Sequence, residues 1–296
     1  MIKMKKTLSL IIVLSIISLF LAESAFAQLE RTRVQEVRPV ELTFMAPRNI
    51  NLYTVEPLSP GELHYSIMHT FGTVDSGIRN LWGIDQGANV RFSFEYGLTE
   101  RLSLGFGRSS LDKVVDFTGR YALLKQMSDN SIPVSVSLNT SAGINTSSFG
   151  FLAEDYTFSD RLNFTGSLLI ARKITENFSL QVSPTVVHFN RVGQETNVAD
   201  TDLNTYYAIG VATRYKIKPR TAVSGQYIPT LNGENTSYNL ALGIDIETGG
   251  HVFQMFFTTS RALNDQYLIA GENGDFFDRQ FRFGFNVNRL FNIRGR

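Results

Sequence analysis

The chain has 296 residues, enough for one large β domain or two ordinary ones, and it is rich in aromatic residues, with 23 Phe and 11 Tyr. It contains no Cys, which excludes disulfides, thiolate catalysis, Cys-based zinc sites and a lipid-modified N-terminal cysteine. A formal charge of +1 gives no reason to expect a nucleic-acid partner, and a mean hydropathy of −0.05 excludes a helical membrane protein with many spans.

The first 27 residues have the pattern of a cleaved export signal. Three lysines within residues 3–6 precede an apolar run from Leu8 to Leu21, and residues 25–27 (AFA) form an A-x-A cleavage site. The run, about 14 residues, is shorter than the roughly 20 that a spanning helix needs. We expect cleavage after Ala27, which removes three lysines and one glutamate and changes the formal charge from +1 to −1. No later stretch is long and apolar enough for a spanning helix, so the mature protein is either soluble or a barrel.

Residues 28–60 are charged and poorly periodic, and they contain Pro39, Pro47, Pro57 and Pro60. Prolines at this density interrupt regular structure. We interpret the segment as a periplasmic N-terminal tail, and the composition favours a mobile linker. The alternative is a short piece tucked into the mouth of a barrel.

A hairpin predicted within residues 87–107 shows the alternation of apolar and polar residues that recurs along the rest of the chain. Strand side chains alternate between two faces. In the first strand one face is apolar and largely aromatic (Val90, Phe92, Phe94, Tyr96) and the other is polar or charged (Asn89, Arg91, Ser93, Glu95). This alternation is typical of a barrel wall with lipid outside and water or polar side chains inside.

The same alternation recurs twelve times between residues 61 and 291. The expected strands are 62–71, 87–97, 101–109, 114–126, 132–143, 160–172, 177–189, 204–216, 221–229, 237–247, 251–259 and 280–291. Short connections such as 98–100, 174–176 and 248–250 mostly alternate with long ones such as 72–86, 145–159 and 262–279. We predict an all-β fold, a closed antiparallel transmembrane β-barrel of about 12 strands, with short periplasmic turns and longer extracellular loops in the outer membrane. Residues 292–296 are a C-terminal tail.

Charged residues of the strands fall on the inward face. The candidates for the lumen are Arg91, Glu95, Asp116, Arg120, Arg214, Asp245, Glu247 and Arg282. An arginine or lysine facing lipid near the midplane would cost roughly 2–4 kcal/mol. Two interpretations remain open: a salt-bridged plug that fills a small barrel, or a polar constriction that selects small solutes. Because both signs are present, strong ion selectivity is not expected.

Other residues that could bind a metal or act in catalysis give weaker signals. His64 and His69 lie five residues apart and point to opposite faces of a strand, so they do not share a metal. His188, on an outward face, has no assignable Ser partner for a hydrolase. The acidic residues Asp265, Glu272, Asp275 and Asp278 lack calcium-loop spacing and are interpreted as a solvated loop.

Trp82 lies in the long loop after the first strand. It either caps the barrel, folds inward to narrow it, or sits at the membrane interface, where Trp is common.

Two tracts, PRNINLYTVEPLSPGELHYSIMHTFG (residues 47–72) and NLWGIDQGANVRFSFEYGLTERLSLGFGRS (residues 80–109), carry a family resemblance. They resemble a family of Gram-negative outer-membrane β-barrel proteins with a domain of unknown function. The resemblance covers the chain from about residue 40 and is sharpest before Lys125. It implies a barrel in the outer membrane and assigns no catalytic residues.

The leading functional hypothesis is a narrow porin-like channel, or a binder, for a small polar solute. The second is a structural or interaction barrel with a plugged lumen that acts through its loops or N-terminal tail. An envelope lipid hydrolase comes third, and we expect no enzyme and no cofactor or metal. The expected partners are outer-membrane lipid, small polar solutes and a periplasmic or surface protein, with no nucleic acid.

Overall fold

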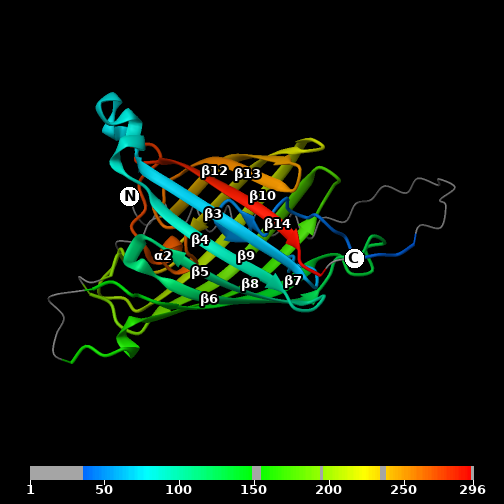
Figure 1. Ribbon diagram of the computed structural model, residues 1–296, viewed down its shortest axis with the longest axis horizontal. Helices are drawn as coiled ribbons and strands as arrows, with labels where there is room; N and C mark the ends of the chain where they lie inside the picture. Colours follow the sequence, from blue (N-terminus) through cyan, green and yellow to red (C-terminus); the bar gives the residue numbers. More distant parts are fainter. Residues whose placement is uncertain (1–35, 149–154, 194–195, 234–237, 295–296) are drawn as a thin grey trace.

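The computed structural model describes residues 36–148, 155–193, 196–233 and 238–294, and its main feature is a closed antiparallel barrel of twelve strands (Figure 1). Each wall strand pairs with the strands before and after it in the sequence, and the last pairs with the first. The wall strands are β3 (Glu62–Thr73), β4 (Asn89–Gly97), β5 (Leu102–Ser109), β6 (Val115–Leu124), β7 (Ser135–Ile144), β8 (Leu162–Lys173), β9 (Phe178–Phe189), β10 (Thr205–Lys218), β11 (Thr221–Pro229), β12 (Tyr238–Thr248), β13 (His251–Thr258) and β14 (Arg282–Asn292).

The predicted strands and the fold class are confirmed, and each strand boundary lies within three residues of the expected one. The largest difference is at β7, which begins at Ser135 instead of residue 132. Pro133 has no backbone N–H to give to a neighbouring strand, so pairing starts after it. The predicted export signal, residues 1–27, and the last two residues of the chain lie outside the described part.

Closure depends on the pairing of β14 with β3. Asn286 lies opposite Met68 and Asn288 opposite Ser66, and pairing runs along both strands with one register shift near Arg282. In hydrocarbon no water is available to bond a free strand edge, so a membrane sheet must close on itself.

The two faces of the wall differ as the alternation predicts. Phe94 is 44 % exposed on the outside and stacks on Tyr65, with ring centroids 4.8 Å apart. Its neighbours Ser93 and Glu95 are buried inside. Aromatic rings therefore cover the lipid-facing side, and polar groups face the barrel axis.

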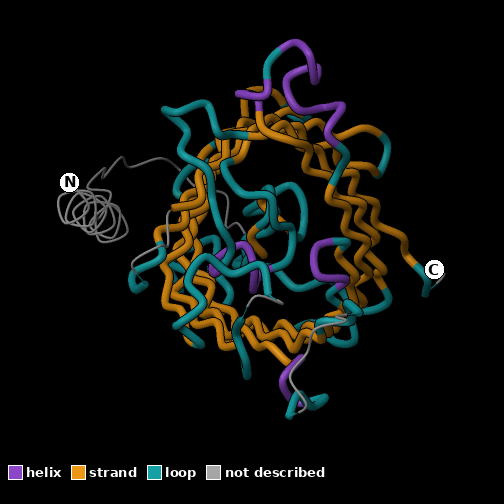
Figure 2. The backbone as a smooth tube through the Cα atoms, turned by 90° about the vertical axis from the view of Figure 1, so that its left-hand side faces the viewer, coloured by secondary structure: helices purple, strands orange, loops and turns teal. Residues whose placement is uncertain are grey.

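An inner segment, residues 43–58, lies inside the barrel (Figure 2) and corrects the linker interpretation of residues 28–60. It contains two short paired strands, β1 (Arg48–Asn49) and β2 (Leu52–Tyr53). Of the remaining tail, residues 36–42 are mostly exposed at the short-turn end and residues 28–35 lie outside the described part. The mobile-linker interpretation was wrong because polar groups of this segment bond to the barrel wall, to Asp265 and to one another.

The long connection between β13 and β14 also turns inward. It carries the helix α2 (Asp265–Ala270), all of whose residues are buried. Asp265, which the sequence placed in a solvated loop, is therefore inside the barrel. Three other connections at the same end carry 3-10 turns: η1 (Val74–Ser76) and η2 (Ile78–Gln86), η3 (Leu111–Lys113), and η4 (Ser159–Arg161). Within the described ranges, no helix has the length and hydropathy required to cross a membrane.

The outward face of the wall generates a stability prediction. Replacing Leu168, at the centre of β8, by Arg should lower the free energy of unfolding by roughly 2–4 kcal/mol, because it places a guanidinium near the bilayer midplane. Ile217→Arg, near the periplasmic end of β10, should lower it by only about 0–1 kcal/mol. Urea unfolding in lipid vesicles measures both, and equal losses would contradict this orientation of the wall.

Candidate functional site in the barrel interior

Two buried ion pairs occupy the wall formed by β4, β5 and β6. Arg91 donates two hydrogen bonds to the Asp116 carboxylate, at 2.5 and 2.7 Å. A side chain at Gly107, which lies between them on β5, would collide with the Arg91 guanidinium. Glycine at this position therefore makes room for the pair.

The second pair joins Arg120 to Glu95, which also accepts a hydrogen bond from the Ser103 hydroxyl. Arg120 faces the inner segment as well, since its Nη1 donates to the backbone carbonyl of Thr54 at 2.6 Å and to that of Pro47 at 3.3 Å. The Arg120 side chain thus connects the wall to the inner segment.

Amide side chains of the wall hold the turn of the inner segment. Gln226 Oε1 accepts from the backbone N–H groups of Asn51 and Leu52, at 3.0 and 3.1 Å. Asn286 Nδ2 donates to the carbonyl of Ile50 at 2.8 Å, and Gln181 Nε2 donates to that of Tyr53 at 2.7 Å. Without these bonds the wall amides and the backbone groups of the segment would be buried and unpaired. Each hydrogen bond therefore satisfies one polar group of the wall and one of the segment.

The two ends of the inner segment are held in the same way. Ser137 donates its hydroxyl to the carbonyl of Val55 at 2.5 Å. Arg214 donates to the carbonyls of Leu42 and Thr43, at 2.6 and 3.0 Å. Most of the contacts that tie this segment to the wall therefore run from a wall side chain to its backbone.

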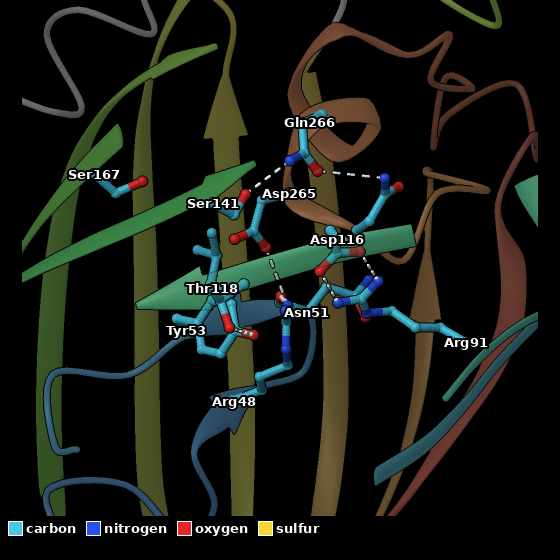
Figure 3. A network of polar contacts seen from close by, with 12 residues as sticks. Arg48, Asn51, Tyr53, Arg91, Asp116, Thr118, Ser141, Ser167, Asp265 and Gln266 are labelled. Atoms are coloured by element: carbon cyan, nitrogen blue, oxygen red, sulfur yellow. Dashed lines mark hydrogen bonds and ion pairs between the residues drawn. The ribbon is translucent and has the colours of Figure 1, made fainter. Parts of the chain in front are cut away.

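Arg48 links the inner segment to α2 (Figure 3). Its Nη1 lies 3.1 Å from Asp265 Oδ1, and its guanidinium stacks 3.7 Å from the centre of the Tyr53 ring. Gln266 of the same helix donates to the Ser141 hydroxyl of β7 at 2.7 Å. The inward loop and the inner segment thus contact one another and the wall.

Apolar packing surrounds α2 on the extracellular side of these polar contacts. The helix residues from Tyr267 to Ala270 belong to a buried cluster that includes Phe189, Tyr206 and Leu52. The Phe189 ring meets Tyr267 edge-on, with centroids 5.2 Å apart. The interior therefore combines hydrogen bonds from the wall with one apolar cluster that the inner segment shares with α2.

The predicted lumen residues separate into groups. The structure brings Arg91, Glu95, Asp116 and Arg120 together as two ion pairs. Arg214 lies near Leu42 and Thr43, and Asp245 is buried beside Ser224 and Gln254. Glu247 is half-buried near the short-turn end, and Arg282 lines a cavity at the opposite end. A constriction role for these residues stays a prediction.

Trp82 projects from the barrel rim on η2 and is 52 % exposed, with Ile78, Leu81 and Ile84 also exposed nearby. The inward-folding alternative for Trp82 is therefore wrong. The loop is anchored by Gly83, whose φ of +91° places its Cα against the backbone of Gly72.

The histidines are arranged as the strand parity predicts. His64 is buried and bonds Asn288 at 3.1 Å, whereas His69 stacks on Phe285 on the other face. His188 bonds the Thr205 hydroxyl at 2.8 Å. Among the residues that the structure describes, no three His, Asp or Glu side chains are grouped so as to hold a metal ion.

The sequence pattern did not select Arg48, assigned Asp265 to a solvated loop, and did not select Gln181, Gln226 and Asn286. The last three share the inward parity of their strands, and that signal alone could have selected them. Arg48 and Asp265 lie outside the wall strands, where no periodicity indicates direction. Their pairing across 217 positions depends on the tertiary fold.

A closed antiparallel barrel with aromatic rings outside and a polar interior defines a membrane barrel of the outer-membrane type. The chain belongs to the family described as "Membrane bound beta barrel domain (DUF5777)", which it matches over residues 44–291. No curated protein matches the chain.

Among solved structures, the NanC porin is 6 % identical, covers 77 % of this chain and 98 % of its own, and gives a TM-score of 0.48. The KdgM porin is 10 % identical over 78 % of this chain and 99 % of its own, with a TM-score of 0.46. An outer-membrane channel from Pseudomonas putida F1 is 14 % identical over 80 % and 98 %, with a TM-score of 0.47. Identities and scores this low say nothing about solute or activity.

The Arg91–Asp116 pair generates a second prediction. Asp116→Leu should lower the free energy of unfolding by roughly 3–5 kcal/mol, because it leaves the Arg91 charge buried without a partner. The double variant Arg91→Met, Asp116→Leu should recover most of that loss. Urea unfolding of wild type, Asp116→Leu, Arg91→Met and the double variant checks this, and additive losses would show that the two side chains are not coupled.

Proposed function

We propose that this barrel is an outer-membrane channel for small polar solutes that the inner segment, residues 43–58, keeps closed. Passage requires that the segment leave its place against the wall. The supporting observation is the polar wall that surrounds the segment: Arg120, Gln181, Gln226 and Asn286 are all buried and hydrogen-bonded to its backbone.

The chemistry of those contacts favours reversibility. A hydrogen bond between a wall amide and a backbone group is exchanged for bonds to water when the two separate, so its net free energy is only about 0.5–1.5 kcal/mol. A wall of Ser, Asn, Gln and Arg remains compatible with water once the segment has moved. An apolar wall would instead require an apolar filling.

The position of the segment favours release from the periplasmic side. The chain reaches the interior at the short-turn end, where Pro39 pairs with Met127 and the backbone N–H of Val40 donates to the Gln126 carbonyl at 2.7 Å. Residues 36–42 are mostly exposed there. A periplasmic protein partner that binds this stretch would pull on the segment directly. The proposal includes export through a cleaved signal at residues 1–27.

A second candidate is a permanently closed barrel that acts through its loops. The apolar packing of α2 favours it, because Tyr267, Leu268 and Ile269 lose their buried surroundings if the inward loop moves. The exposed apolar side chains around Trp82 would then present a surface to a partner or to lipid.

We assign no catalytic role to the barrel. The hydrolase hypothesis needed a serine beside His188, and the hydroxyl within hydrogen-bonding distance is that of Thr205, at 2.8 Å. Outer-membrane lipid is the proposed partner of the apolar outer face of the barrel.

The two wall arginines provide a matched test of this proposal. Arg120→Ala removes the long hydrogen bond to Pro47 and the short charge-assisted one to Thr54. The second alone is worth about 1.5–3 kcal/mol, so the closed–open equilibrium should shift at least roughly 10- to 100-fold toward open. Arg91→Ala leaves a buried carboxylate unpaired in the same way, but the side-chain bonds of Arg91 run to Ser109 and Asp116 of the wall, so this variant serves as the control. Planar-bilayer conductance should rise in Arg120→Ala and stay near wild type in Arg91→Ala.

Two results would contradict the proposal. Conductance in Arg120→Ala no higher than in wild type would favour the permanently closed barrel. An equal rise in both variants would indicate general loosening of the wall.

A further inference from the structure

A cavity of about 570 Å³ opens at the extracellular mouth, away from the inner segment. It lies among the ends of β3, β4 and β14 and the loop that follows β13. Its lining consists of Phe71, Gly72, Thr73, Gln86, Gly87, Ala88, Asn89, Arg261 and Arg282. The volume is within the range of small-molecule sites.

Two guanidinium groups, those of Arg261 and Arg282, line the cavity. In the described part of the chain neither Arg261 nor Arg282 has a carboxylate within ion-pair distance of 4 Å, and the two repel one another electrostatically. The carboxylates whose fields reach Arg282 belong to Asp75 and Glu272, which are both exposed. Like charges held side by side are stabilised by an anion between them.

The polar atoms of Arg282 point to the same conclusion. Its Nε and Nη1 are buried and have no hydrogen-bond partner. Buried donors are almost always satisfied, so these two N–H groups require an acceptor that the protein does not supply. A planar guanidinium suits an oxyanion, which can accept two parallel hydrogen bonds.

The surrounding backbone positions these groups firmly. The carbonyl of Arg261 accepts from Thr70 Oγ1 at 2.7 Å and from Asn89 Nδ2 at 2.9 Å, which ties the loop after β13 to β3 and β4. Gln86 ends η2 beside Gly72, where its side-chain amide lines the same cavity. Gly72, Asn89 and Arg282 have inward parity, whereas Phe71 and Thr73 have the opposite parity, so the cavity lies at the rim of the wall.

We propose that this cavity binds a small solute carrying a carboxylate or a phosphate, with Arg282 and Arg261 as the anion-binding residues. The inference rests on the proposed channel function and deepens it by naming the class of solute. Gln86 contributes a polar group for the uncharged part of the solute.

The test is equilibrium binding to the full-length barrel in detergent micelles, measured by isothermal titration calorimetry. Glucuronate and glucose 6-phosphate serve as probes of the two oxyanions, and glucose is the neutral probe of similar size. At least one charged sugar should bind, and glucose should bind about tenfold more weakly or not at all. Comparison of the two charged probes identifies the preferred oxyanion.

The variants locate the binding. Arg282→Gln and Arg261→Gln should each weaken binding of the charged sugar about tenfold or more. Arg279→Gln, an exposed arginine in the same loop that does not line the cavity, should bind like wild type. Retained strand content by circular dichroism confirms that each variant is folded.

Three results would each overturn the inference. These are equal affinity for glucose and both charged sugars, no binding of glucuronate and none of glucose 6-phosphate, and unchanged binding in Arg282→Gln. The measurement does not depend on opening of the barrel. A barrel that binds the charged sugar but shows no conductance in Arg120→Ala would therefore contradict the channel proposal while leaving this site in place.

Discussion

In the hydrocarbon of a bilayer a strand has no water with which to satisfy its backbone, and this constraint shapes every part of the molecule. The pairing of β14 with β3 removes the last two free edges. Once the sheet is closed, each side chain has only two directions, toward lipid or toward the axis. The period-2 pattern of the chain then becomes a partition of apolar from polar groups, with Phe94 on one side and Glu95 on the other.

That partition creates a second requirement, because the inner face gathers many polar groups into a small space. Arg91 with Asp116, and Arg120 with Glu95, satisfy part of this demand within the wall. The backbone of the inner segment satisfies much of the remainder by accepting from Gln181, Asn286 and Arg120 and donating to Gln226. The segment lies in the barrel because its main chain complements the wall, and its prolines do not prevent this.

The interior has two regions with different physical character. Between the inner segment and the wall the contacts are mainly hydrogen bonds that water can replace. Around α2 they are apolar contacts that water cannot replace, and Leu52 and Tyr53 of the segment take part in them. Arg48, which pairs with Asp265 and stacks on Tyr53, joins the two regions. The mouth cavity with Arg261 and Arg282 lies outside both, so a solute bound there does not compete with the inner segment for wall partners.

The sequence alone determined the barrel. Twelve alternating segments, the side that each residue faces and the two loop-length classes are local properties of the chain, and the inward placement of Arg91, Glu95, Asp116 and Arg120 followed from parity. The tertiary structure decided which inward residues meet and what fills the interior. Residues 43–58 and the loop of α2 have no periodicity that indicates direction, and their positions depend on partners such as Asp265 for Arg48, 217 positions apart. The unpaired N–H groups of Arg282 likewise depend on the tertiary structure, because β3, β4 and β14 together bury them. The local sequence pattern specifies which face a residue lies on, but its contacts depend on the closed wall.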